Sequence, residues 1–155
     1  MDRPRPSTRR LKDDEVERLL ALDVPARLAT LQPDGFPRVT PIWFLWEAGA
    51  FYMTSVEGAP HLRNLRREPR AGICVDIEAG MPVASGVRPN ASVKAWGMAS
   101  LKTDTGGQWT RRITLKYVSG DAGLARAEFR AQMDRVVIEL RPGRLLSAGT
   151  LEVLG

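Results

Sequence analysis

The chain has 155 residues, which suits one domain with enough chain for a sizeable core. Its content of 43% hydrophobic and 26% charged residues is ordinary for a soluble globular protein, and no apolar run approaches the length of a membrane span. The net charge of +5 suits either nucleic acid or a small polyanion as the partner. Because no helix-turn-helix, zinc-ligand or ribonucleoprotein motif accompanies this charge, a nucleic-acid-binding function rests on charge alone.

The N-terminus is rich in arginine and proline, so residues 1–10 are expected to form a flexible basic tail before a single domain over residues 11–155. Such a tail is either merely mobile or an arm that reaches over an anionic ligand. It contains no apolar signal-peptide core, and we therefore expect a cytoplasmic protein. Asp13 is typical of a helix N-cap, and apolar residues at helical spacing predict a helix that ends before Pro25.

Three strands are predicted next, at Ala26–Leu31, Pro37–Trp46 and Ala50–Thr54. The turn between the first two contains Pro33-Asp34-Gly35, in which proline presets φ and glycine tolerates a positive φ. The short segment Glu47-Ala48-Gly49 connects the second strand to the third.

The second strand is apolar on both faces near its far end, whereas a strand in a one-sided sheet would alternate. One face carries Ile42, Phe44 and Trp46, and the other carries Pro41, Trp43 and Leu45. We therefore expect a barrel wall whose outside is covered, for example by a partner subunit. Pro41 has no amide hydrogen to donate, so it predicts an edge, a bulge or a ligand-facing position.

Positive charge and hydroxyl groups concentrate after the third strand. Thr54 and Ser55 offer hydroxyls, and a short helix from His61 to Arg67 offers free amides at its start and several arginines. Hydroxyl, amide and guanidinium groups together make a good phosphate cradle. The alternative is a solvated basic helix face that binds nothing.

The rest of the chain alternates strands, a long loop and two helices. Strands are predicted at Arg70–Asp76, Val93–Leu101, Arg135–Arg141 and Arg144–Leu151, with Pro142-Gly143 as a turn between the last two. Residues 77–92 are expected to be a loop, which is either a lid or surface ornament. Gly97 predicts a bulge or a close backbone approach. Helices are predicted at residues 108–118, where Trp109, Ile113 and Tyr117 recur every four residues, and at residues 122–133.

Several of these segments resemble the pyridoxamine 5′-phosphate oxidase-like family. The segments are LATLQPDGFPRVTPIWF, FYMTS and PHLRNLRREPRAGICVD, and the similarity continues through SVKAWGMASL and RVVIELRPGRLLS. The resemblance implies a mainly β protein with peripheral helices, folded as a split β-barrel that binds FMN or the deazaflavin F420. It also implies a homodimer with two cofactor sites at the subunit interface.

The resemblance assigns two groups of cofactor-binding residues. Those along the second strand, which would follow the ring and the ribityl chain, are Arg38, Val39, Thr40, Pro41, Ile42 and Trp43. Those that would hold the phosphate are Met53, Thr54, Ser55, His61, Arg63 and Asn64. Relatives commonly carry lysine where this chain has His61, and a neutral histidine compensates a phosphate less well.

The chain contains no paired carboxylates, catalytic triad or metal cluster, as expected of an enzyme whose cofactor performs the redox step. The resemblance implies an oxidoreductase that transfers a hydride between FMN or F420 and a small organic substrate. The alternatives are a non-catalytic carrier of a flavin or a haem-type ligand and, on charge alone, a nucleic-acid-binding module. FMN and F420 both carry a phosphate, and the arginines of the basic helix would also suit the oligoglutamate tail of F420.

Overall fold

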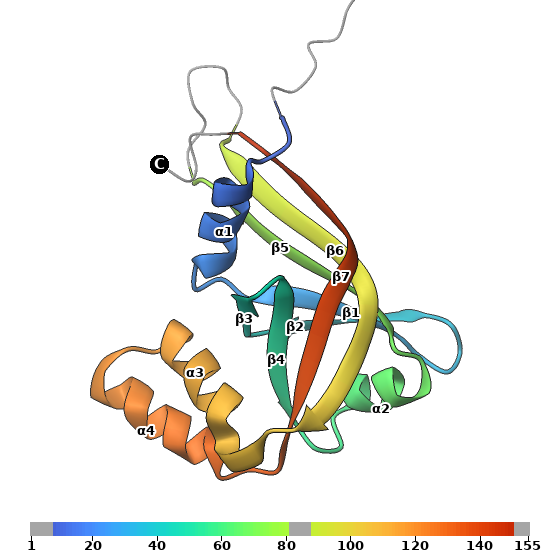
Figure 1. Ribbon diagram of the computed structural model, residues 1–155, viewed down its shortest axis with the longest axis vertical. Coiled ribbons are helices and arrows are strands. Elements are labelled where there is room, and N and C mark those ends of the chain that lie inside the picture. The colour runs from blue at the N-terminus through green and yellow to red at the C-terminus, as the bar shows by residue number, and fades with distance from the viewer. Residues whose placement is uncertain (1–7, 81–87, 151–155) are drawn as a thin grey trace, which may run out of the picture.

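A single curled antiparallel sheet of seven strands forms most of the molecule in the computed structural model, which describes residues 8–80 and 88–150 (Figure 1). The strands are β1 Ala26–Leu31, β2 Pro37–Ile42, β3 Phe44–Glu47, β4 Ala50–Val56, β5 Arg70–Glu78, β6 Asn90–Thr103 and β7 Arg135–Gly149. Their order across the sheet is β2-β1-β5-β6-β7-β4-β3. The predicted mainly β split barrel with peripheral helices is confirmed.

Within residues 8–80 and 88–150, four α-helices lie around the sheet: α1 Asp13–Ala21, α2 Pro60–Arg67, α3 Gln108–Tyr117 and α4 Gly120–Ala131, with a short 3-10 turn at Thr105–Gly107. Figure 1 shows α3 and α4 as a hairpin beside β3 and β4, α2 near β1, and α1 at the other end of the barrel. None of the helices in the described part of the chain is both long enough and apolar enough to cross a bilayer.

The predicted second strand is wrong in one respect, because it breaks at Trp43 into β2 and β3. β2 pairs with β1 at one edge of the sheet, whereas β3 pairs with β4 at the opposite edge. The chain crosses from edge to edge through a single residue, so the two edges must meet there. Sequence periodicity runs through Trp43 without interruption and cannot report this change of partner.

The barrel interior is one apolar core. Phe44 and Phe51 are fully buried in it together with Leu28 and Met53, and Leu19 of α1 closes one end. A smaller cluster lies on the outer side of β4 and β7, where the helix hairpin covers them. There the ring of Tyr52 stacks on Trp109 of α3, with ring centroids 4.0 Å apart. The chain's own helix α3 thus covers part of the second face of the predicted second strand, since Trp43 stacks on Tyr117, whereas Pro41 on the same face is exposed.

β6 and β7 are long strands with one irregularity in their pairing. The register shifts between Trp96 and Gly97, so that Gly143 has no partner on β6. A Cβ atom at Gly97 would lie 2.7 Å from the carbonyl oxygen of Arg141, which confirms both the predicted bulge and the predicted close approach. The predicted turn at Pro142-Gly143 is wrong, because β7 continues through it. Pro142 is tolerated because β4 pairs with β7 only as far as Leu140.

The remaining differences concern boundaries. The N-cap of α1 is Lys12 rather than Asp13, and α4 begins and ends two residues earlier than predicted. β5 and β6 extend into the predicted loop, as far as Glu78 and from Asn90. Residues 81–87 of that loop, residues 1–7 of the predicted tail and Leu151 of the predicted last strand lie outside the described residues. Arg9 pairs with Gly149 of β7.

Candidate functional site

The predicted cofactor strand, β2, is an edge strand with an open outer face. Val39 is 62% exposed, and Arg38 and Pro41 are also exposed, whereas Thr40 and Ile42 are half-buried. Because β2 pairs only with β1, Pro41 leaves no ladder partner unsatisfied, and the predicted edge position is confirmed. β2 therefore offers both side chains and free backbone groups to a ligand.

The N-terminal turn of α2 packs against β1 and so lies close to β2. The side-chain amide of Asn64 donates a hydrogen bond to the hydroxyl of Thr30 over 3.1 Å, between two buried residues. Thr30 in turn pairs with Arg38 across the β1–β2 ladder. The fold thus brings His61 and Asn64 of α2 toward Arg38 of β2, although these residues lie far apart in the sequence.

His61 is buried without a hydrogen-bond partner for one of its nitrogens. Its side chain is only 7% exposed, and Nε2 finds no donor or acceptor among the described residues. Burial lowers the pKa of His61 below its usual value, and the positive charge of Arg38 lowers it further. A buried polar atom of this kind fits an external partner, and an oxygen of a phosphate would supply one.

The arginines around α2 divide into two classes. Arg66 pairs with Glu57 over 2.6 Å and Arg70 pairs with Glu68 over 2.8 Å, so their charges are compensated locally. Among the described residues, the Arg63 guanidinium donates only to the carbonyl of Gly58, over 2.7 Å. Arg67 donates to the carbonyl of Leu31, and neither it nor Arg38 forms an ion pair within the described ranges, although Arg67 is close enough to Glu68 to help lower the pKa of that carboxyl. The positive charge left for a ligand therefore belongs to Arg38, Arg63 and Arg67.

The end of β4 does not present its three predicted residues together. Met53 lies in the barrel core, and Ser55 lies on the same side of the strand by alternation. Thr54 faces the helix hairpin instead, where its hydroxyl donates a hydrogen bond to the hydroxyl of Thr110 over 3.0 Å. All three residues are buried. We therefore separate Thr54 from the surroundings of α2.

A buried polar network, which the sequence did not reveal, surrounds Thr54. The Arg135 guanidinium donates to the Thr54 carbonyl over 3.0 Å and to the Thr110 hydroxyl over 3.1 Å. The Thr110 hydroxyl also donates to the Asp104 carboxylate over 2.6 Å, and this carboxylate accepts the amides of Trp109 and Thr110. The network fixes the start of α3 on the barrel. These residues are spread along the chain without any local motif.

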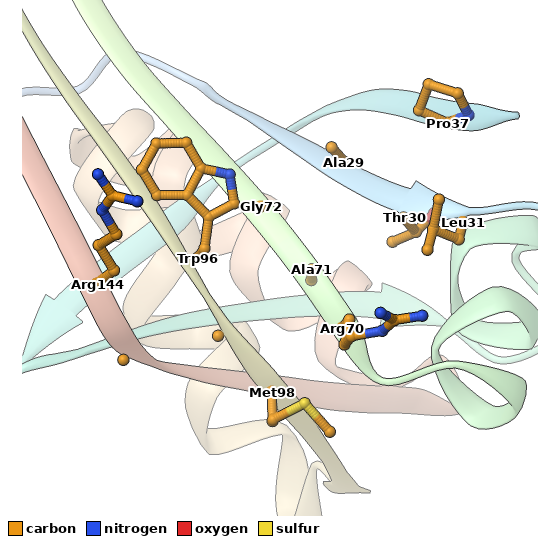
Figure 2. Close-up of a pocket in the computed structure, with 12 residues that line it drawn as sticks. Ala29, Thr30, Leu31, Pro37, Arg70, Ala71, Gly72, Trp96, Met98 and Arg144 are labelled. Carbon is orange, nitrogen blue, oxygen red and sulfur yellow. The ribbon is translucent and has the colours of Figure 1, made fainter.

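An open, mostly apolar cavity of about 510 Å³ lies on the outer face of β1, β5, β6 and β7 (Figure 2). We call it the Trp96 cavity, because the Trp96 side chain forms one wall and is 43% exposed. Figure 2 shows the indole lying over Gly72, where a Cβ atom would come within 3.3 Å of the ring. Met98 is 60% exposed nearby, and Thr30 connects the cavity to the surroundings of α2.

A second open cavity, of about 430 Å³, lies between the end of β2 and α4, and we call it the α4 cavity. It brings four of the predicted residues together, and its lining includes Pro41, Ile42, Trp43, Thr54, Arg126 and Arg130. The indole of Trp43 stacks on Tyr117 with ring centroids 4.7 Å apart and 3° between the planes. Sequence reasoning missed Arg126 and Arg130, because no local motif distinguishes them from ordinary exposed arginines on a helix.

No cluster of metal-binding side chains occurs in the described ranges 8–80 and 88–150.

Comparisons with solved structures agree on the fold. A conserved hypothetical protein from Mycobacterium tuberculosis superposes with a TM-score of 0.71 at 19% identity, covering 94% of this chain and 89% of its own. A FAD and haem binding protein from Mycobacterium smegmatis gives 0.73 at 20% identity, with 93% and 73% covered. A protein described as an F420 reductase gives 0.59 at 23% identity, with 83% and 94% covered. At these identities the likeness shows the fold alone.

Among curated protein sequences, none matches the chain significantly. The profile of the family described as pyridoxamine 5′-phosphate oxidase, however, matches residues 13–147, which include every strand of the barrel except the last two residues of β7. This match confirms the resemblance of the sequence segments. The chain therefore belongs to the pyridoxamine 5′-phosphate oxidase family.

Proposed function

We propose that the protein is an oxidoreductase that binds FMN and transfers a hydride between this cofactor and a small organic substrate. The observation that carries the proposal is the buried, unpartnered Nε2 of His61 at the N-terminus of α2. It lies among arginines that lack carboxylate partners in the described residues, a setting that suits a phosphate group.

The residues of this chain would bind and orient the cofactor. His61 and Arg63 would hold its phosphate, Arg38 would add charge from β2, and the exposed face of β2 around Val39 would support the rest of the molecule. A bound flavin supplies the hydride chemistry itself. Asn64, which is fixed by Thr30, would keep the first turn of α2 in place.

The charge pattern favours FMN over F420. The oligoglutamate tail of F420 would need several uncompensated cations, but Arg66 and Arg70 are already paired with Glu57 and Glu68. FMN carries a single phosphate, which the remaining arginines suffice to balance. F420 stays the second candidate, because Arg67 forms no ion pair among the described residues and could meet part of the tail.

Two variants on the same helix test the proposed phosphate site. Arg63→Ala removes a guanidinium that has no carboxylate partner, whereas Arg66→Ala removes one that is paired with Glu57. Loss of a charge-assisted hydrogen bond costs about 1.5–3 kcal/mol, so Arg63→Ala should weaken FMN binding by at least about tenfold. Arg66→Ala should change it by less than about threefold. Quenching of FMN fluorescence measures both, and equal affinities for the two variants and the parent would show that the phosphate binds elsewhere.

A non-catalytic carrier of a flavin or haem-type ligand is the second candidate. It is favoured by the lining of the Trp96 cavity, which contains arginines but no carboxylate, histidine or cysteine. Such a cavity binds an apolar ligand without providing an acid or a base. Anaerobic reduction of the cofactor-loaded protein, followed by mixing with candidate organic acceptors, distinguishes the two. A carrier would keep its cofactor reduced with every acceptor.

We further propose that two copies of the chain form a homodimer through the outer sheet face around the Trp96 cavity. Trp96, Met98 and Leu146 leave large apolar surfaces exposed there, and a stable interface buries more than about 1,000 Å² in total. Met98→Arg should shift the protein toward monomer in light scattering. Phe129→Arg is the matched control, because Phe129 is equally exposed on α4. A monomeric parent protein at micromolar concentration with FMN bound would contradict the proposal.

A further inference from the structure

We propose that the α4 cavity is a separate subsite that binds the oxyanion of an aromatic organic substrate, such as a carboxylate, between Arg126 and Arg130. The proposal rests on the proposed function only in naming this ligand the substrate. The cavity has a volume of about 430 Å³, within the range of small-molecule sites. Its wall at Trp43 directly continues β2, so a ligand there would lie beside the strand that we propose for the cofactor.

The charges on the helix hairpin single out these two arginines. Arg111 pairs with Glu128 over 2.6 Å, and Arg112 pairs with Glu47 over 2.7 Å. Arg126 and Arg130 form no ion pair with any residue of the described ranges, yet both line the cavity. The two arginines of the hairpin with carboxylate partners are thus not among the residues that line the cavity, whereas the two that line it form no ion pair in the described ranges.

Arg130 is held in a defined position. Its guanidinium donates to the Thr114 hydroxyl over 2.7 Å and lies over the ring of Trp43, 4.9 Å from the ring centroid. A guanidinium has five N–H donors, so several remain for an oxyanion. Such a preorganised fork loses little side-chain entropy when a carboxylate binds.

The positive charges near the cavity oppose one another when no anion is present. Burial lowers the pKa of Arg130, and the nearby Arg126 lowers it further. Behind them, burial and then Arg130 lower the pKa of Arg135 to about 10. Arginine stays charged at neutral pH even so, and this repulsion remains in the free protein. A bound anion would relieve it, which gives the site a preference for anions over neutral analogues.

The apolar wall suits a planar ligand. Trp43 is fixed on one side by its stack on Tyr117, whose hydroxyl donates to the Val24 carbonyl over 2.9 Å. Ile42 and Pro41 extend the apolar surface beside the indole. Tyr117 stacks on one face of the Trp43 indole and the Arg130 guanidinium lies over the ring, so the indole offers its edge to a ligand. An aromatic ring would make an edge-to-face contact with this wall while its carboxylate met Arg130, and such contacts are favourable beyond the buried area alone.

Calorimetric titration with benzoate and with its neutral analogue benzamide tests the subsite. Arg130→Gln should weaken benzoate binding by about tenfold or more, and Arg126→Gln by several-fold because Arg126 is exposed. Arg130→Lys should lie between Arg130→Gln and the parent, since lysine keeps the charge but not the fork. Arg112→Gln, which removes the same charge from a paired arginine, should stay within about twofold of the parent. Benzamide should bind equally to all these proteins.

Four outcomes would overturn the proposal. The first is that the parent does not bind benzoate, and the second is that Arg126→Gln and Arg130→Gln bind benzoate as tightly as the parent. The third is that Arg112→Gln loses as much benzoate affinity as these two variants. The fourth is that the FMN affinity of Arg126→Gln falls as much as its benzoate affinity. The last result would assign the arginines to the cofactor. Thermal melting of each variant separates lost binding from lost folding, and exposed Arg126 gives a variant that leaves the core intact. Failure of the parent to bind FMN or F420 would refute the proposed function but leave the benzoate result unchanged.

Discussion

The buried imidazole of His61 leads to an unusual expectation for the variant His61→Leu: it should stabilise the free protein. Nε2 has no hydrogen-bond partner among the described residues, and a buried polar group in that state costs about 1–3 kcal/mol. Leucine has a similar volume and no polar atom to leave unsatisfied. After imperfect packing is allowed for, we expect the free energy of unfolding to rise by about 1 kcal/mol, which raises Tm by about 2–4 °C in a chain of this size.

The same variant should bind FMN less well. If Nε2 meets the phosphate, its loss removes a charge-assisted hydrogen bond of about 1.5–3 kcal/mol, and the dissociation constant should rise by about 10- to 150-fold. The stability and the affinity of His61→Leu would thus change in opposite directions. Such a trade-off is expected where a binding site keeps an unsatisfied group for its ligand.

The pH dependence of stability gives an independent readout of His61. Its pKa in the folded protein lies below the unfolded value of about 6.5 because burial disfavours the charged ring. Below about pH 6.5 the unfolded chain therefore binds a proton that the folded chain does not, and stability falls as the pH decreases through this window. Above about pH 6.5 the ring is neutral in both states, so His61 adds no pH dependence to the stability. His61→Leu should remove this part of the acid-side loss.

Urea unfolding of the parent and of His61→Leu at pH 7.5 and 5.5 measures both effects. Asn64→Leu is the matched control on the same helix, because Asn64 is equally buried but is satisfied by Thr30. It should destabilise the protein, since the Thr30 hydroxyl loses its donor. The reasoning is refuted if His61→Leu is destabilised as much as Asn64→Leu and keeps the acid-side loss of the parent.

Two further predictions concern stability. Gly97→Ala should lower the free energy of unfolding by about 2–3 kcal/mol, because the added Cβ atom would lie 2.7 Å from the Arg141 carbonyl oxygen. Gly143→Ala, where the nearest atom to an added Cβ is 4.0 Å away, should lower it by less than about 1 kcal/mol in the same chemical denaturation. Burial lowers the pKa of Lys116 to about 8, so the unfolded chain binds the additional proton above that pH and stability should rise between pH 8 and 9.5. Lys116→Met should abolish this rise, and an unchanged rise in thermal melts would assign it to another group.

Local signals were sufficient for most of the barrel. The residues of β1, β4 and α2 were predicted to within two positions, because apolar alternation, the glycine-containing turns and Pro60 at the start of the helix mark their limits. The break at Trp43 was missed for a different reason. β2 and β3 are both good strands locally, and only the closure of the sheet decides that they belong to opposite edges.

For the candidate site as well, the sequence predicts what depends on local spacing and misses what depends on tertiary contacts. The proximity of His61 and Asn64 follows from the helical spacing of one short segment. The separation of Thr54 from that group depends on which face of β4 the helix hairpin covers, which a single strand cannot reveal. Arg126 and Arg130 lie far along the chain from Trp43 and carry no motif. Their role emerges only from the tertiary contact between α4 and the end of β2.

The distribution of unpaired charge bears on the basic pI that first raised nucleic acid as a partner. Arg27, Arg66, Arg70, Arg111 and Arg112 are all paired with carboxylates. Among the arginines that form no ion pair in the described ranges, Arg38, Arg63 and Arg67 lie in the surroundings of α2, and Arg126 and Arg130 line the α4 cavity. Arg10, Arg88 and Arg144 lie apart from both sites, and Arg144 lines the Trp96 cavity. A duplex presents phosphates at regular short intervals and is matched by a continuous basic stripe. Two separate clusters, one beside a buried unpartnered imidazole and one beside an aromatic wall, match compact anions better, because each can balance only a few negative charges at one place.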